Sequence, residues 1–242
     1  MKVMLFGHKS SEIEEEVKQA GLELVTENPE VIITYGGDGT LLSSEREFPG
    51  VPKLAIRDNS ICKKCTSHLD EKLFKRFAES NLKLSEFPKL ETQFNNKTLL
   101  ALNDFVIRNQ LPTHAIRFIV LKNSEQVVDK LIIGDGVVAS TAFGSSGYFK
   151  SITQETFSDN FAIAFNNTTE KINPVPFKQD DLITVKIIRG PATLSLDNSP
   201  DIYTLEGNSE IDIKASSQTL KQYEANTLRC PDCEITRSLN TP

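Results

Sequence analysis

The sequence has 242 residues, of which 38% are hydrophobic, and it carries a formal net charge of -6 with an isoelectric point of about 5.3. This length and hydrophobic content suffice for one large or two small packed domains. The acidic balance argues against nucleic acid as a partner, although a small basic pocket could still bind phosphates. The apolar run at the N-terminus is too short for a signal peptide, and no stretch of about 18 apolar residues follows, so we expect a cytoplasmic protein without a membrane partner.

Over the first eighty or so residues, short apolar runs alternate with amphipathic stretches, which is typical of β-α-β units. In SSEIEEEVKQAG, residues 10–21, a serine is expected to cap a helix, acidic residues fill its first turns and Gly21 follows as a C-cap. The fully apolar run VIITYG, residues 31–36, is typical of an interior strand of a parallel sheet.

After about residue 85 the helical periodicity fades, and runs rich in β-branched residues take over. Examples are AIRFIVLK, FAIAFNN, DLITVKIIRG and EIDIKAS. We therefore expect an α/β, Rossmann-like domain over residues 1–84, and a mostly antiparallel, β-sandwich-like domain over residues 85–225. The remaining residues, 226–242, are expected to return to the α/β domain.

The turn after VIITYG reads Gly36-Gly37-Asp38-Gly39-Thr40 and precedes a predicted helix. Ligands of open α/β sheets bind beyond the carboxyl ends of such strands. Glycines there are expected to take positive φ values and to approach a ligand closely, and the amides that open the helix can bind a phosphate. Phosphates repel a lone carboxylate unless a cation intervenes or the carboxylate acts as a base. Asp38 is therefore predicted to be magnesium-associated or a general base, and the alternative is a plain turn with a capping aspartate.

Two later stretches carry polar groups that could select a ligand. In ALNDFVI, residues 101–107, the Asn103-Asp104 pair offers a donor, acceptors and a carboxylate, although it could also be a bulge or a turn. In GDGVVASTAFGSSGY, residues 134–148, small residues, several hydroxyls and one tyrosine form a loop that suits close approach of a base. Taken alone, that loop would also fit an ordinary hairpin.

These three stretches resemble, in order and approximate spacing, the motifs of the NAD kinase family, a branch of a superfamily that includes diacylglycerol, sphingosine and 6-phosphofructokinases. The resemblance covers most of residues 1–215 and implies an NAD kinase-like fold. It also implies transfer of a phosphoryl group from ATP with Mg²⁺, or from polyphosphate, to the adenosine-ribose 2′-hydroxyl of NAD, giving NADP. Members of the family form homodimers and homotetramers.

The resemblance also assigns roles to individual residues of this sequence. It implies that Asp38 is the catalytic base. It also implies that the residues that bind the nucleotides lie around Asp38 and in the two later motifs. The residues implied to bind the nucleotides are Gly36, Gly37, Gly39, Thr40, Asn103, Asp104, Asp135, Thr141, Ser146, Gly147 and Tyr148. Asp135 is expected to belong to the same ligand pocket as the Asn103-Asp104 pair.

The sequence departs from the family in three places. The family reads Thr-Pro-Thr-Gly-Ser-Thr-Ala-Tyr where this chain reads TAFGSSGY, residues 141–148. The family's later Gly-Gly-Pro-Ile and Pro-His stretches are missing, and AIRDNSICKKCTSHL replaces its Gly-x-Asn-x-Gly-x-x-Gly-Phe-Leu stretch. These changes leave open NADH as the acceptor, a related lipid or sugar kinase, and a non-catalytic nucleotide sensor.

The four cysteines form two pairs with the spacing Cys-x-x-Cys. Cys62 with Cys65, and Cys230 with Cys233, have the two-by-two spacing of a tetrahedral zinc site. A structural zinc ion there would tie the C-terminal segment to the loop that lacks the family's glycines. Free thiols, or two local pairs that never meet, are the alternatives.

Overall fold

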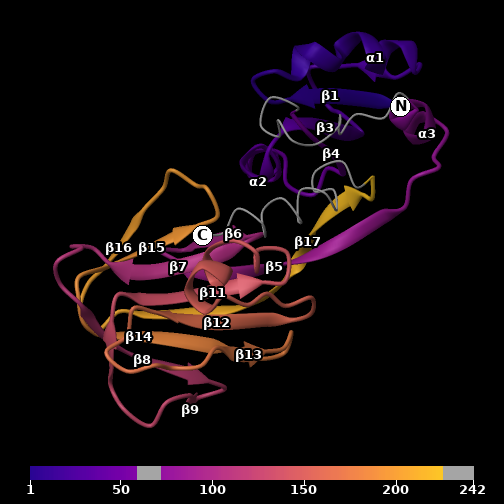
Figure 1. The fold of residues 1–242 in the computed structure, drawn as a ribbon. Helices are drawn as coiled ribbons and strands as arrows, with labels where there is room; N and C mark the ends of the chain where they lie inside the picture. The colour runs from indigo at the N-terminus through magenta and orange to yellow at the C-terminus, as the bar shows by residue number, and fades with distance from the viewer. Residues whose placement is uncertain (59–71, 226–242) are drawn as a thin grey trace. The chain divides into compact units, whose positions relative to one another are not determined.

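The computed structural model describes residues 1–58 and 72–225, and their contacts divide the chain into two compact units (Figure 1). The first unit contains Met1–Phe87 and the described residues from 220 to 225, and the second contains Pro88–Thr219. Strands β5 (Leu84–Phe94) and β17 (Glu210–Tyr223) contribute residues to both units.

The first unit is an α/β structure, as the sequence predicts. Its strands β2, β1, β3 and β4 lie side by side in that order, all parallel, and the end of β17 pairs in parallel with β4. The elements are β1 (Lys2–Phe6), η1 (Ser10–Ile13), α1 (Glu14–Gln19), β2 (Glu23–Leu24), β3 (Val31–Gly36), α2 (Asp38–Glu47), β4 (Lys53–Arg57) and α3 (Leu73–Ala78).

Strand β3 confirms the interpretation of VIITYG as an interior strand, since every residue of it is buried. Val31 and Ile33 pack in one core with Val17 of α1, Leu54 of β4 and Phe77 of α3. The core therefore uses helices together with the parallel sheet, as a β-α-β rhythm requires.

The first helical segment differs in detail from its prediction. It opens as the 3-10 turn η1 and becomes α-helical only at Glu14, and neither start has a side-chain cap hydrogen bond. The expectation of a serine cap is therefore wrong. Gly21 does follow the helix with φ +78, and Lys18 pairs with Glu14 one turn earlier, at 2.6 Å.

The second unit consists of two antiparallel sheets. One has the order β13-β12-β11-β7-β15-β16, and the other contains β10-β8-β14-β17 with β9 beside β8 and the β5-β6 hairpin beside β17. The elements are β6 (Lys97–Ala101), β7 (Asp104–Asn109), β8 (Ile116–Lys122), β9 (Glu125–Gln126), β10 (Ile132–Gly134), β11 (Gly136–Thr141), α4 (Tyr148–Thr153), β12 (Phe161–Asn166), β13 (Val175–Phe177), β14 (Ile183–Arg189), β15 (Ala192–Leu196) and β16 (Tyr203–Leu205).

One hydrophobic core joins both sheets of this unit. It contains Phe105 of β7 and Ile163 of β12 from one sheet, and Phe118 of β8, Val185 of β14 and Ile211 of β17 from the other. Two sheets that bury one face each against a common core form a sandwich. The predicted β-sandwich-like domain is therefore confirmed, although helix α4 and strand β5 were not predicted.

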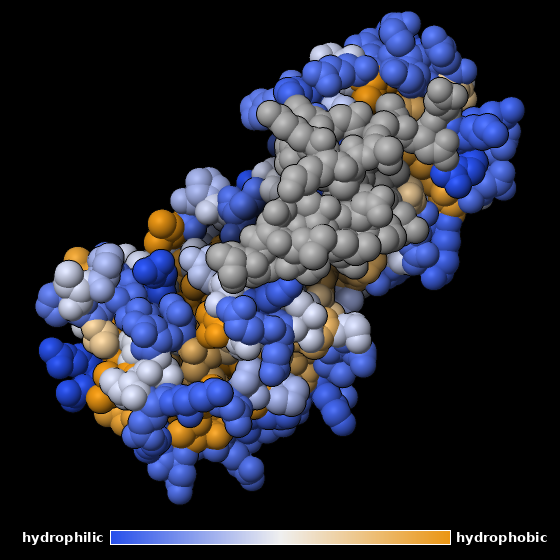
Figure 2. All heavy atoms as spheres, viewed as in Figure 1, coloured by the Kyte–Doolittle hydropathy of each residue, from blue (hydrophilic) through white to orange (hydrophobic). Residues whose placement is uncertain are grey.

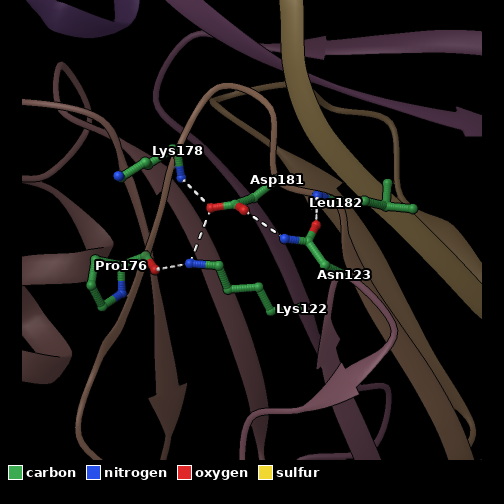
Figure 3. Close-up of polar contacts among 6 residues, drawn as sticks. All are labelled: Lys122, Asn123, Pro176, Lys178, Asp181 and Leu182. Atoms are coloured by element: carbon green, nitrogen blue, oxygen red, sulfur yellow. Dashed lines mark hydrogen bonds and ion pairs between the residues drawn. The ribbon is translucent and has the colours of Figure 1, made fainter.

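A carboxylate network ties two loops of the second unit together (Figure 3). Asp181 accepts hydrogen bonds from Lys178 N and Asn123 Nδ2, each at 2.7 Å, and pairs with Lys122 Nζ at 3.0 Å. Because these donors favour the ionised form, they lower the pKa of Asp181 to about 2, with the Lys178 amide as the largest cause. The network fixes the start of β14 against the turn that follows β8.

The visible surface of the described residues is largely hydrophilic, with hydrophobic side chains in scattered patches (Figure 2). Ile202 and Leu111 are the most exposed large hydrophobic residues, at 68% and 51%. Within residues 1–58 and 72–225, no helix is long and apolar enough to span a membrane.

Candidate functional site

The carboxyl ends of β1, β3 and β4 meet at one edge of the parallel sheet in the first unit. The chain leaves β3 through Gly36 and Gly37, and α2 begins at Asp38. Asp58, which follows β4, donates its backbone N–H to the Gly36 carbonyl at 3.1 Å. Residues that are distant in sequence are therefore brought together at the edge where open α/β sheets bind ligands.

Glycine is needed at this edge for a different reason from the one predicted. None of Gly36, Gly37 and Gly39 has a positive φ, so that expectation is wrong. A Cβ on Gly36 would instead lie 2.1 Å from Thr40 Oγ1. The positive φ belongs to Gly7, which follows β1 with φ +130 and passes so close to the Tyr35 carbonyl that a Cβ would lie 2.2 Å from its oxygen.

Asp38 lies among charged groups at this edge. Its Oδ2 is 3.8 Å from Arg57 Nη2, and the side chains of Arg57 and Asp38 are 6% and 29% exposed. Next to Arg57 along the chain, the buried Asp58 pairs with Lys9 Nζ at 3.4 Å. Asp38 is thus partly open to solvent beside Arg57 and the amides that open α2, which is an arrangement suited to a phosphate group.

Lys9, Arg57 and Asp58 were not singled out by the sequence analysis. Each of the three follows a parallel strand, Lys9 after β1 and the other two at the end of β4. The rule that ligands bind at the carboxyl ends of parallel strands, applied to all three strands instead of β3 alone, would have found them.

In the second unit, Asn103 and Asp104 form the corner between β6 and β7. Thr141 closes this corner, because its Oγ1 donates to the Leu102 carbonyl at 2.6 Å and its N–H donates to the Asn103 carbonyl at 2.9 Å. The same Thr141 oxygen accepts the Gly144 N–H at 3.0 Å. The structure therefore brings the Asn103-Asp104 and Thr141 motifs together within one unit.

The polar atoms of this corner are poised for a ligand. Asn103 Oδ1 is buried and accepts no hydrogen bond from the residues that the structure describes. An unsatisfied buried acceptor is costly, so a donor on a ligand would stabilise it. The carboxyl group of Asp104 is buried as well, and this burial, with the nearby charge of Asp197, raises its pKa to about 7.

The remaining loop residues, Ser146, Gly147 and Tyr148, are exposed, and Tyr148 opens helix α4 after Gly147 as N-cap. Behind the loop, Ser145 Oγ donates to the Phe157 carbonyl at 3.0 Å. A cavity of about 520 Å³ lies beside this point. It is lined by Phe149, Glu155, Thr156, Phe157, Asp159, Asn160, Phe161, Ala162, Asn173, Pro174 and Pro176.

Asp135 does not lie at this corner. It precedes β11, whereas Thr141 ends that strand, so the two are separated by roughly 20 Å at the usual rise per residue. Its carboxylate accepts from Asn109 Nδ2 at 3.3 Å and from Asn167 Nδ2 at 2.9 Å. Antiparallel pairing of β11 with β7 thus carries Asp135 to the end of the strand pair away from Asn103 and Asp104, and its place in the same ligand pocket stays a prediction.

The predicted zinc ligands, Cys62, Cys65, Cys230 and Cys233, lie outside the described residues, so zinc binding stays a prediction of the sequence. Within the part of the chain that the structure describes, no group of three or more His, Cys, Asp or Glu side chains could hold a metal ion.

The unusual pKa of Asp104 predicts how stability depends on pH. The folded-state pKa of about 7 lies above the ordinary aspartate pKa of 3.8, so the folded protein binds more protons between these values. The free energy of unfolding should therefore fall as the pH rises from about 4 to about 7, by up to about 4 kcal/mol. Asp104→Asn should remove this fall, as measured by urea unfolding across that range.

Asp181 provides the control for that experiment, because its pKa of about 2 is shifted in the opposite direction. Asp181→Asn should lower stability by a constant amount above about pH 4, so the fall between about pH 4 and about pH 7 should keep its slope, and the pH dependence should change only below about pH 4. An Asp104→Asn protein with the unchanged wild-type slope would contradict the assignment of this titration to Asp104.

Comparison with known proteins gives relatives of one kind. NAD kinase 1 of Halalkalibacterium halodurans is 29% identical over 148 residues, which cover 54% of this chain. The chain thus spans about half of that relative's length, 53%. An NAD kinase of Saccharolobus islandicus is 28% identical over 215 residues, covering 83% of this chain and 82% of the relative. The chain is thus similar in sequence to NAD kinases of bacteria and archaea.

The fold is also that of NAD kinases. The crystal structure of an NAD kinase from Archaeoglobus fulgidus in complex with ATP has a TM-score of 0.77 at 20% identity, covering 98% of this chain and 99% of the other. The predicted NAD kinase-like fold is confirmed. No model of a protein family matches the sequence.

Proposed function

We propose that this chain transfers the γ-phosphoryl group of ATP to the 2′-hydroxyl on the adenosine ribose of NAD, giving NADP and ADP. The observation that carries the proposal is Asp38, a partly exposed carboxylate at the start of α2 with Arg57 at 3.8 Å. Sequence similarity to NAD kinases and the ATP bound by the structurally similar Archaeoglobus protein support the choice of substrates.

The first unit would supply the donor site and the base. The amides that open α2, with Lys9 and Arg57, would bind the phosphates of ATP. Asp38 would accept the proton of the attacking 2′-hydroxyl, while the oxygen of that hydroxyl forms the new bond to the γ-phosphorus. The bond between the γ-phosphorus and the bridging oxygen breaks, and ADP leaves with that electron pair.

Mg²⁺ fits this edge as a companion of the donor. The carboxylates of Asp38 and Asp58 are oxygen ligands of the type this ion prefers, and it is commonly held by one or two carboxylates together with substrate phosphates. The ion would neutralise charge on the transferring group.

The second unit would bind NAD at the Asn103-Asp104 corner. Asn103 Oδ1 would accept a hydrogen bond from the ligand, and the Asp104 carboxylate would accept hydrogen bonds from ribose hydroxyls. Ser146, Gly147 and Tyr148 are exposed where the 141–148 loop meets α4, and would contact the ligand from that side.

Asn103→Ala should weaken NAD binding by about ten- to a hundredfold, because the ligand loses a hydrogen bond partner in a buried position. Isothermal titration calorimetry measures this change directly. Gln126→Ala, at an exposed amide side chain of the same unit, is the control and should leave the dissociation constant within about twofold. Equal affinities in the two variants would remove Asn103 from the site.

The acceptor is tested by transfer of labelled γ-phosphate from ATP to NAD, NADH, a diacylglycerol and a hexose in parallel. Label in NAD, at the 2′-position, is expected. Label in the lipid or the sugar alone would assign the chain to another branch of the superfamily. A cytoplasmic location and a homodimeric or homotetrameric state belong to the same proposal, since they follow from the family resemblance.

A further inference from the structure

Asp197 holds the Asn103-Asp104 corner from the side opposite Thr141. It follows β15, and its two carboxylate oxygens accept three consecutive backbone N–H groups of the corner. Oδ2 accepts from Leu102 N at 2.9 Å, and Oδ1 accepts from Asn103 N at 2.7 Å and from Asp104 N at 3.2 Å. The Asp197 N–H in turn donates to the Asp104 carbonyl at 3.0 Å.

The corner is therefore fixed at both its donors and its acceptors. Thr141 binds the carbonyls of Leu102 and Asn103, and Asp197 binds the N–H groups of Leu102, Asn103 and Asp104. Hydrogen bonds from amides to a carboxylate are among the stronger ones in proteins. Because the backbone is held on both sides, the Cα–Cβ bonds of Asn103 and Asp104 point in fixed directions.

We propose that Asp197 is a positioning residue for the dinucleotide: its carboxylate holds residues 102–104 so that Asn103 and Asp104 meet the ligand. This inference rests on the proposed function, because it assigns Asp197 to the same binding corner. Nothing in the sequence motifs of that corner includes Asp197, which lies more than ninety residues later in the chain.

The backbone conformation of Asp197 helps to explain why this position has an aspartate. Its φ is +47, in the left-handed region that costs most side chains energy but is tolerated by aspartate and asparagine. A turn at this position could use either residue without strain. Only aspartate, however, presents two acceptor oxygens to three N–H groups, since asparagine would turn an amide N–H₂ group toward one of these donors.

Asp197 also acts on the charge of the corner. On one side of Asp104 lies its pairing partner on β11, the uncharged Ser140. On the other side lies Asp197, in the segment that follows β15. Among the described residues of this unit, Asp197 is the charged neighbour that raises the pKa of Asp104, after burial as the larger cause. Removal of the Asp197 charge should therefore lower the pKa of Asp104.

Asp197→Asn tests the proposal because asparagine keeps the size and the φ preference of the native residue. We expect the dissociation constant and KM for NAD to rise by about tenfold or more, as for other small displacements of positioned groups. The KM for ATP and the kcat at saturating NAD should stay within about twofold. The pH at which NAD binding strengthens as Asp104 ionises should move to lower values.

Asp181→Asn is the matched control. Asp181 also accepts a backbone N–H and a side-chain N–H in a loop of the same unit, but it contacts Lys178, Asn123 and Lys122 and not the corner (Figure 3). This variant should lower thermal stability without changing NAD binding or its pH dependence. If the two variants show the same small change in affinity, Asp197 has only a structural role and the proposal is overturned.

A second measurement separates this proposal from the proposed function. In urea unfolding, the midpoint of the Asp104-dependent fall in stability should move to lower pH in Asp197→Asn, relative to the wild type, whether or not the chain acts on NAD. A shifted midpoint in a chain that binds no NAD would contradict the proposed function and keep the link between Asp197 and Asp104. An unmoved midpoint would overturn that link.

Discussion

Asp38→Asn should lower the kcat for NADP formation by about a hundredfold to ten-thousandfold, the usual range for removal of a general base. The amide has nearly the size of the carboxylate but cannot accept the proton of the attacking hydroxyl at neutral pH. The helix start and the nearby Arg57 should tolerate the change, since Asp38 is partly exposed. Dissociation constants for NAD and ATP should therefore stay within a few-fold.

The rate is measured as transfer of labelled phosphate to NAD at saturating substrates, with both affinities determined by calorimetry. Asp129→Asn, at an exposed carboxylate of the second unit, is the control and should match the wild type. Full activity in Asp38→Asn would remove this residue from the mechanism. A loss of ATP binding equal to the loss of rate would instead make Asp38 part of the donor site.

Gly144→Ala should abolish NAD binding and lower stability by about 1–3 kcal/mol or more. A Cβ at Gly144 would lie 2.3 Å from the Asn103 carbonyl oxygen and 2.4 Å from Asn103 Cα. These are backbone atoms that Thr141 and Asp197 hold in place, so no side-chain rotation relieves the contact. The corner itself must move, and the ligand groups of Asn103 and Asp104 move with it.

Gly207→Ala is the control for this prediction, because the nearest atom to its Cβ would be the Ile188 carbonyl oxygen at 3.9 Å. Thermal unfolding and NAD calorimetry on the two variants measure the difference. We expect Gly207→Ala to resemble the wild type in both. If Gly144→Ala retained wild-type affinity, the contact between the 141–148 loop and the corner would have no part in binding.

The sequence predicted those parts of the fold that depend on local pattern. VIITYG was correctly interpreted as an interior strand, because a parallel strand covered on both faces needs an unbroken apolar run. The serine cap of the first helix was wrong, since the chain enters that helix through a 3-10 turn. Helix α4 was not predicted, because its sequence, YFKSIT, is too short to show a helical period.

The site was predictable where its residues are adjacent in sequence and not where they meet only in space. Asp38, and the pairing of Asn103-Asp104 with Thr141, came from contiguous motifs. Asp197 was missed because LSLDNS reads as a strand followed by a turn. Its hydrogen-bond partners, residues 102–104, come near it only through the pairing of β15 with β7, which are distant in sequence. A positive φ was expected at Gly36 because it is a glycine. The structure shows another reason for glycine there, since the Thr40 side chain leaves no room for a Cβ.

The most direct test of the proposed function is NADP formation by the wild-type chain from NAD, ATP and Mg²⁺, read with an NADP-specific dehydrogenase. The proposal predicts many molecules of NADP per chain, and none when ATP is omitted. Binding of NAD and ATP without any NADP, with polyphosphate also failing as donor and NADH failing as acceptor, would contradict it. That result would make the chain a nucleotide sensor that keeps the NAD kinase fold.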